Sequence, residues 1–163
     1  MKLFHGTKFT FDTFSVDYPG TGEAGNIHAI WFANNFTAAR NHAWQVGNYS
    51  QCWVYECELA ADAVLMKADI SLNQQPAIQK QLTNVLPVCI SVQTHYDTLF
   101  ADYFRFNKID PEYHDDHEIT LLRHAGIDAI YDYERGWQDA HLHGATTVVL
   151  TPEKIRILAV HDV

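Results

Sequence analysis

Short apolar runs that end in polar residues mark the first expected strands. An apolar pair followed by His-Gly-Thr occupies residues 3–7, and a second apolar run at 29–33 is followed by two asparagines. The first run predicts a short buried strand whose glycine allows a ligand to approach the backbone. The asparagines are typical helix N-caps, so a helix containing residues 37–44 is expected next. We therefore expect Trp31 and His42 to face one cleft.

The pattern changes along the rest of the chain. Alternation over residues 51–59 predicts a half-buried strand with Trp53, Tyr55 and Cys57 on one face and Val54, Glu56 and Glu58 on the other. Apolar residues at spacings of three or four then predict helices within residues 70–106, interrupted at Pro87. The polar residues 107–117 predict a loop, and a helix is expected from about Glu118 to His124.

Length and composition predict one domain over residues 1–163, because 163 residues with 47% hydrophobic content are enough for a single core. No apolar run is long enough for a membrane span and no leader precedes the first strand, so we expect a cytoplasmic protein that does not enter a membrane. Cys52, Cys57 and Cys89 have no metal-site spacing and are expected to be buried free thiols.

Charge limits the class of partner. The net charge is -9 and only 11 residues are Lys or Arg, which argues against a broad phosphate-binding face. A protein is therefore a more plausible partner than a nucleic acid. The cluster of His and acidic residues at 114–118 is interpreted as a helix N-terminus with acids that complement the helix dipole, and His141 and His143 as strand residues, so no metal is expected.

The motifs, in their order, resemble those of the ADP-ribosyltransferases of the His-Tyr-Glu type. This family includes the poly(ADP-ribose) polymerases, the diphtheria-like toxins and many phage and bacterial relatives. It carries His-Gly-Ser/Thr on one strand, Ile-Tyr-Phe on a second, and a further aromatic residue eleven positions after the first, on a helix. The corresponding residues here are His5-Gly6-Thr7, Ile30-Trp31-Phe32 and His42. Residues 125–130 and 148–158 are similar to its later strands, whereas about 60 to 120 are unmatched.

The resemblance implies an α+β fold in which two small, mainly antiparallel sheets surround an NAD cleft with flanking helices. It implies that His5 binds the ribose, that the Gly6 backbone holds the nicotinamide carboxamide, and that Trp31 and His42 stack on the nicotinamide ring. Aromatic planes hold a flat pyridinium well. The implied NAD-binding set is completed by Thr7, Phe32 and Thr146.

The chain departs from the family at two positions. Thr146 stands where active relatives have the glutamate that stabilises the oxocarbenium-like transition state, and a threonine carries no charge for that purpose. Ala39 replaces the serine that binds the carboxamide. A carboxylate from the loop at 131–144 is the expected substitute for the glutamate. Asp139 is the first choice, because an anti-CRISPR ADP-ribosyltransferase is similar there, and Glu134 is the second.

Two functions follow from the resemblance. The first is a mono-ADP-ribosyltransferase that uses NAD as co-substrate, releases nicotinamide and modifies a protein acceptor, as toxins and phage effectors do. The alternative is a degenerate member of the fold that binds NAD, ADP-ribose or a protein without transfer. An RNA 2'-phosphotransferase of the same superfamily ranks third, because arginines are few.

Overall fold

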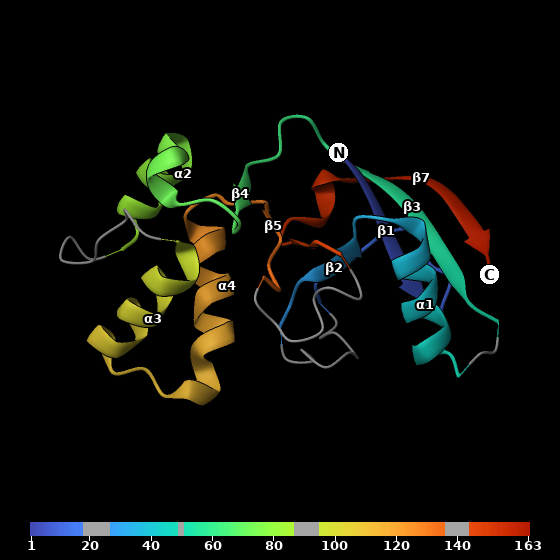
Figure 1. Cartoon of the computed structure of the whole chain (residues 1–163), viewed down its shortest axis with the longest axis horizontal. Helices are drawn as coiled ribbons and strands as arrows, with labels where there is room; N and C mark the ends of the chain where they lie inside the picture. Colours follow the sequence, from blue (N-terminus) through green and yellow to red (C-terminus); the bar gives the residue numbers. More distant parts are fainter. Residues whose placement is uncertain (18–26, 49–50, 87–94, 136–143) are drawn as a thin grey trace.

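In the part of the chain that the structure describes, seven strands and four α-helices form an α+β arrangement (Figure 1). The computed structural model describes residues 1–17, 27–48, 51–86, 95–135 and 144–163. Within these ranges the strands form a single sheet in the order β4-β5-β6-β2-β1-β3-β7. Their bounds are β1 Lys2–Thr7, β2 Ile30–Ala33, β3 Trp53–Leu59, β4 Leu65–Lys67, β5 Ala129–Tyr131, β6 Thr146–Val149 and β7 Ile155–Asp162. The α+β class expected from the sequence is confirmed.

The strands form one continuous sheet, but the pairing between β1 and β2 is limited to one pair of residues. Every other neighbouring pair of strands is joined through at least three residue pairs, whereas β1 and β2 are joined only where Phe4 lies opposite Ala33. We call the region beyond this pair, with residues 5–7 of β1 and 30–32 of β2, the β1–β2 junction. The expectation of two separate sheets is therefore wrong in this respect: two half-sheets, β7-β3-β1 and β2-β6-β5-β4, share one pair of residues. All neighbours are antiparallel except β4 and β5.

Helix α1, Phe36–Val46, covers one face of β1 (Figure 1). The side chain of Asn35 caps it by accepting a hydrogen bond from the Ala38 backbone N–H at 2.8 Å, which confirms the expected cap and the helix over 37–44. Its buried residues are all alanines, Ala38, Ala39 and Ala43. Small side chains on this face allow the helix backbone to lie directly on β1.

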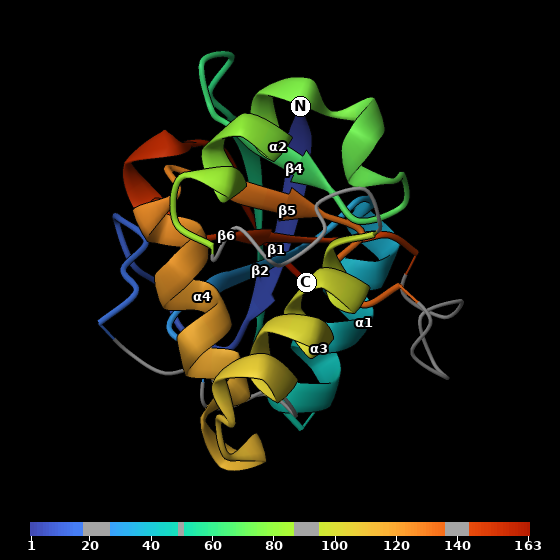
Figure 2. The same cartoon turned by 90° about the vertical axis from the view of Figure 1, so that its left-hand side faces the viewer.

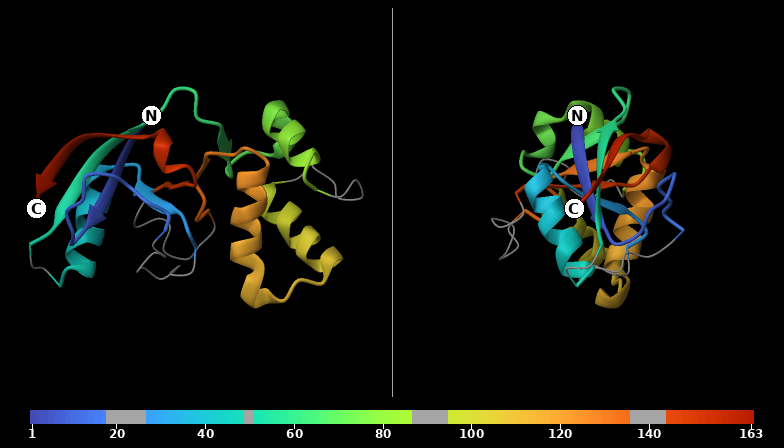
Figure 3. Two further views of the ribbon diagram at one scale, coloured as in Figure 1. Left: turned by 180° about the vertical axis from the view of Figure 1, so that it is seen from behind. Right: turned by 90° about the vertical axis from the view of Figure 1, so that its right-hand side faces the viewer.

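Phe11 and Phe14 cover the opposite face of the same half-sheet. The rings of Phe11 and Tyr55 stack 4.3 Å apart, and the Tyr55 hydroxyl donates to the Phe11 carbonyl at 2.9 Å. Phe14 packs edge-on against the Tyr55 ring. Figure 3 shows β1, β3 and β7 side by side from the edge of the molecule. Cys57 is buried in this core and is a free thiol, as is Cys52, whereas Cys89 lies outside the described residues.

The other half-sheet is covered by helices α2, α3 and α4 (Figure 2). These span Pro76–Thr83, Tyr96–Asn107 and His114–His124, and the short helices η1, η2 and η3 span Leu72–Gln74, Pro111–Tyr113 and Pro152–Lys154. Ile78, Leu82, Leu99, Phe100, Ile119 and Leu122 belong to the core between these helices and the strands. The helices expected within 70–106 are therefore present.

Two expected boundaries are wrong in this half. Helix α4 begins at His114 rather than near Glu118, and Asp115 and Asp116 in its first turn complement the helix dipole. Residues 125–127 form the turn that follows α4 rather than part of a strand, because Gly126 adopts a positive φ of 77° and turns the chain. Strand β5 therefore starts at Ala129.

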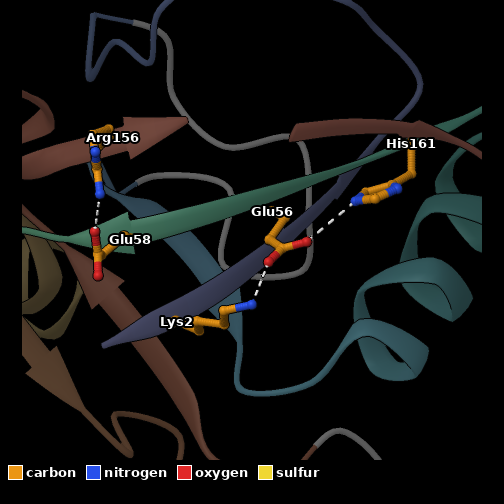
Figure 4. A network of polar contacts seen from close by, with 5 residues as sticks. All are labelled: Lys2, Glu56, Glu58, Arg156 and His161. Carbon is orange, nitrogen blue, oxygen red and sulfur yellow. Dashed lines mark hydrogen bonds and ion pairs between the residues drawn. The ribbon is translucent and has the colours of Figure 1, made fainter. Parts of the chain in front are cut away.

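A network of charged side chains lies on the half-sheet β7-β3-β1 (Figure 4). Glu56 accepts from Lys2 at 2.6 Å and lies 3.4 Å from His161, and Glu58 pairs with Arg156. The hydrogen bond from Lys2 lowers the pKa of the Glu56 carboxyl. Because these groups are solvent-accessible, the pairs contribute little to stability. Each charged side chain of the network is thus paired with another of the same network.

Candidate functional site

His5 bridges the β1–β2 junction. Its Nδ1–H donates to the Trp31 carbonyl at 2.8 Å, so the side chain spans the two strands where their backbones separate. This bond fixes the neutral tautomer in which Nε2 carries a lone pair. The rings of Phe14 and Phe32 lie 5.3 and 5.6 Å from the imidazole. His5 is therefore a fixed hydrogen-bond acceptor in aromatic surroundings.

Its surroundings also keep His5 uncharged. The half-buried ring has a pKa of about 4, because burial among apolar groups disfavours the imidazolium. The hydrogen bond to Trp31 opposes this shift, and a charge on His42 adds slightly to it. At neutral pH, Nε2 can accept a hydrogen bond from a ligand hydroxyl, as the proposed ribose contact requires.

The depressed pKa of His5 predicts a pH-dependent stability. An unfolded histidine has a pKa of about 6.5, so the unfolded chain takes up a proton at His5 between about pH 6.5 and 4 that the folded protein does not. The contribution of His5 to the free energy of unfolding is complete above this window and is lost as the pH falls through it. Urea denaturation from about pH 7 to 4.5 should show a smaller loss for His5→Gln than for the parent protein. Equal losses would contradict the assignment.

Gly6 is required by the packing of α1 against β1. A Cβ atom at Gly6 would lie 1.9 Å from the Ala39 carbonyl oxygen and 2.9 Å from the Ala43 nitrogen, far inside contact distance. The close approach that this glycine permits is therefore made by a helix backbone, whereas the sequence suggested a ligand. The buried Ala39 lies at this contact.

The backbone of Gly6 nevertheless points into the junction. Leu59 N–H donates to the Met1 carbonyl at 2.9 Å, which sets the odd-numbered residues of β1 to bond with β3. The N–H and C=O of Gly6 consequently face β2, beyond the last pair at Phe4. An amide donor and acceptor at this point match the two groups of a carboxamide.

Thr146 holds a carboxylate. Its hydroxyl donates to Glu134 Oε2 at 2.5 Å; Thr146 is buried and Glu134 is half-buried. Thr146 lies on β6 opposite Ala33 of β2, and β2 separates β6 from β1. A carboxylate from the preceding loop is therefore held at the position of Thr146.

The turn that carries Glu134 is anchored on both sides. Tyr133 N–H donates to the Thr146 carbonyl at 3.1 Å, and Arg135 Nη1 donates to the Ala68 carbonyl at 2.9 Å. Asp132 adopts a positive φ of 57° where the chain leaves β5. These contacts fix the Glu134 backbone, so the position of the carboxylate is set by the fold.

Trp31 lies next to this turn. Its ring packs edge-on against Tyr133 with centroids 5.2 Å apart, and it is partly exposed. Trp31 and Thr146 lie on the same sheet face as Phe4 and Gly6, because Trp31 is two residues from Ala33, which pairs with both Phe4 and Thr146. Trp31, Thr146 and Glu134 are thus brought together on the face that α1 also covers.

The remaining predicted residues fall into three groups. His42 is exposed on α1 and close enough to His5 for their charges to interact. Phe32 contacts His5 on the other face, and the Thr7 hydroxyl accepts from Phe9 N–H at 3.1 Å in the turn after β1. Asp139, the preferred catalytic acid, lies outside the described residues, as do His141 and His143.

The described residues bring no three His, Cys, Asp or Glu side chains together as a metal site. His114 stacks on Phe104 with ring centroids 4.0 Å apart and hydrogen-bonds the Ile109 carbonyl at 3.1 Å. The contacts of His114 with Phe104 and Ile109 therefore explain its position as a packing residue.

Two of the cavities formed by described residues are lined by none of the site residues predicted from the sequence. One of about 540 Å³ lies between α3 and α4, and one of about 280 Å³ lies beside β4 and α2.

Comparisons of the chain with family models, curated proteins and solved structures found no match. None of the helices in the described ranges has the length and apolar character to span a bilayer.

Proposed function

We propose that this chain is a mono-ADP-ribosyltransferase that transfers ADP-ribose from NAD to a protein acceptor and releases nicotinamide. The observation that carries the proposal is the hydrogen bond between Thr146 and Glu134, which places a carboxylate beside the strand that bears Trp31. Without that carboxylate the departure at Thr146 would favour a binding module. The motif resemblance described above supplies the reaction class, and the ADP-ribosyltransferase-like fold is part of the same proposal.

The residues at the junction suit the binding half of this task. Nε2 of the neutral His5 would accept a hydrogen bond from a ribose hydroxyl, and the Gly6 backbone would pair with the carboxamide. Trp31 offers a partly exposed aromatic ring, and His42 lies on the adjacent helix. A planar cationic ring beside aromatic side chains gains on the order of 1 kcal/mol from each stack.

Glu134 would serve the chemical step. In this reaction class the bond between ribose C1 and the nicotinamide nitrogen breaks, the electron pair stays on nicotinamide, and C1 bonds to the acceptor nucleophile. Glu134 would stabilise the positive charge that develops at C1 and take the proton that the nucleophile loses. Thr146 would act as a positioning residue that orients the carboxylate through its hydroxyl.

The proposed acceptor is a protein. The net charge of -9 opposes non-specific attraction to the phosphates of a nucleic acid. The same charge favours a partner surface that is basic, because association is then electrostatically assisted.

The test is release of nicotinamide from NAD by the purified protein, alone and with cell lysate, together with intact-mass detection of ADP-ribose on lysate proteins. We expect release in both conditions and adducts in lysate. His5→Ala should abolish release, because it removes the ribose contact and the bridge between the strands. Lys8→Ala, an exposed change just after β1, is the control and should leave release unchanged.

Two outcomes would overturn the transferase. Release that is equal in the parent protein and His5→Ala would mean that the junction does not act on NAD. No release, with NAD binding still detected by calorimetry, would identify the alternative, a degenerate member of the fold that binds NAD without transfer.

A further inference from the structure

The cavity between α3 and α4 is lined by aromatic rings and by two carboxylates. Its volume is about 540 Å³. Phe100 and Phe104 of α3 line it together with Tyr133, and Asp115 and Glu118 line it from α4. The two acids are three residues apart, so they lie on one face of the helix. Figure 2 shows α3 and α4 next to each other in front of the half-sheet.

Charge is distributed unevenly within this cavity. Burial and the carboxylates of Glu118, Asp115 and Glu134 raise the pKa of the Tyr133 hydroxyl. The potential around this hydroxyl is therefore negative. The basic residues that line the cavity, Arg105 and Lys108, are exposed at the end of α3. Arg105 is already paired with Asp102 at 2.5 Å. A cation is therefore favoured at the wall that Tyr133 and Glu118 form.

We propose that this cavity binds an arginine side chain of the protein substrate. The description of the partner as a substrate rests on the proposed function. A guanidinium is flat, it stacks on aromatic rings, and its donors match carboxylate oxygens, so it uses both the aromatic walls and the acids. A lysine ammonium also interacts with aromatic faces, but it has neither the flat surface for stacking nor the paired donors that match a carboxylate. An anionic ligand would be repelled by Asp115 and Glu118.

The position of the cavity relates it to the candidate site. Tyr133 lines the cavity and its ring also contacts Trp31, with centroids 5.2 Å apart. Glu134 is the next residue and is held by Thr146. A segment anchored by its arginine in the cavity would thus lie beside the carboxylate to which the transfer step is assigned.

Arginine binding can be measured without NAD. We would titrate the ¹⁵N-labelled protein with N-acetylarginine amide and record amide chemical shifts, using N-acetylcitrulline amide as the uncharged analogue of the same shape. Saturable shifts at Ala101, Lys108 and Tyr133 are expected with the arginine compound, and much weaker shifts with citrulline. Equal shifts with both compounds, or shifts confined to other parts of the protein, would overturn the proposal.

Three variants test the acids. Glu118→Gln and Asp115→Asn should each weaken binding of N-acetylarginine amide about tenfold, because a charge-assisted hydrogen bond is lost. Asp116→Asn is the matched control, since this neighbour carries the same charge but does not line the cavity. Unchanged binding in Glu118→Gln and Asp115→Asn, with retained spectra, would contradict the role of the carboxylates. A loss in Asp116→Asn equal to theirs would indicate general attraction to an acidic surface and would also overturn the site.

The same variants separate this inference from the proposed function. Nicotinamide release from NAD alone should be unchanged in Asp115→Asn, whereas labelling of lysate proteins should fall. Arginine binding without any nicotinamide release would leave the cavity as a docking site and refute the transferase. Nicotinamide release without arginine binding would support the transferase and refute the arginine site.

Discussion

Replacing Glu134 with glutamine is expected to lower the rate of nicotinamide release from NAD about 100-fold. Glutamine keeps the shape of the side chain and can still accept a hydrogen bond from Thr146, but it carries no negative charge to stabilise the ribosyl cation. The loss should appear mainly in kcat, since the carboxylate acts on the charge that develops during bond cleavage. Steady-state kinetics with NAD alone measure it.

The matched control for this change is Asp132→Asn. Asp132 lies in the same turn and adopts a left-handed φ of 57°, a conformation that asparagine tolerates well. Its rate should stay within about threefold of the parent. A full rate in Glu134→Gln combined with a large loss in Asp139→Asn would show that Asp139 is the acid.

Thr146→Val should give an intermediate result. The variant removes the hydroxyl that orients Glu134 while keeping the shape of the β6 side chain. A loss of about tenfold in nicotinamide release is expected, since a carboxylate that is still present but less well oriented retains part of its effect. A loss as large as that of Glu134→Gln would place the threonine itself in contact with the reacting atoms.

Replacing Gly6 with alanine is expected to lower the free energy of unfolding by about 3 kcal/mol, at the upper end of overpacking costs. The added methyl group would lie 1.9 Å from the Ala39 carbonyl oxygen, and that oxygen belongs to a helix backbone that cannot rotate away. For a protein of this size the change corresponds to a melting temperature lower by about 10 °C. Urea and thermal denaturation followed by circular dichroism measure both.

Gly126→Ala separates close packing from backbone strain. Gly126 has a positive φ of 77°, but the nearest atom to an added Cβ is the end of the Gln81 side chain at 3.6 Å. Its substitution should cost only about 1 to 2 kcal/mol, the penalty for the left-handed conformation. Equal losses in Gly6→Ala and Gly126→Ala would show that α1 shifts easily on β1.

Local patterns predicted the half-sheet that contains β1 and β3 well. Asn35 marked the start of α1 because its side chain can cap a helix, and the alternation over 51–59 marked β3 because one face of that strand is buried. The pairing of β4 with β5 and the course of the chain around α3 were not predicted, because partners distant in the sequence determine them. The start of α4 at His114 was obscured by a run of polar residues that is also typical of a loop.

The sequence predicted individual residues of the candidate site but not the hydrogen bonds that join them. The sequence marked His5 and Glu134, yet nothing in it shows that Nδ1 of His5 would reach the Trp31 carbonyl or that Thr146 would hold Glu134. Both bonds depend on strands that lie side by side only after folding. The preference for Asp139 over Glu134 is not tested by the described residues.

The order of the strands has a consequence for synthesis of the protein. Strand β6, near the end of the chain, lies between β2 and β5, and β7 completes the opposite edge. A nascent chain that stops before Thr146 therefore has β2 and β5 without the strand that joins them, and open strand edges favour aggregation. Neither half-sheet can close before β6 and β7 have been made, and Thr146 cannot hold the Glu134 carboxylate until β6 is in place. A chain that ends before Thr146 would therefore lack this contact.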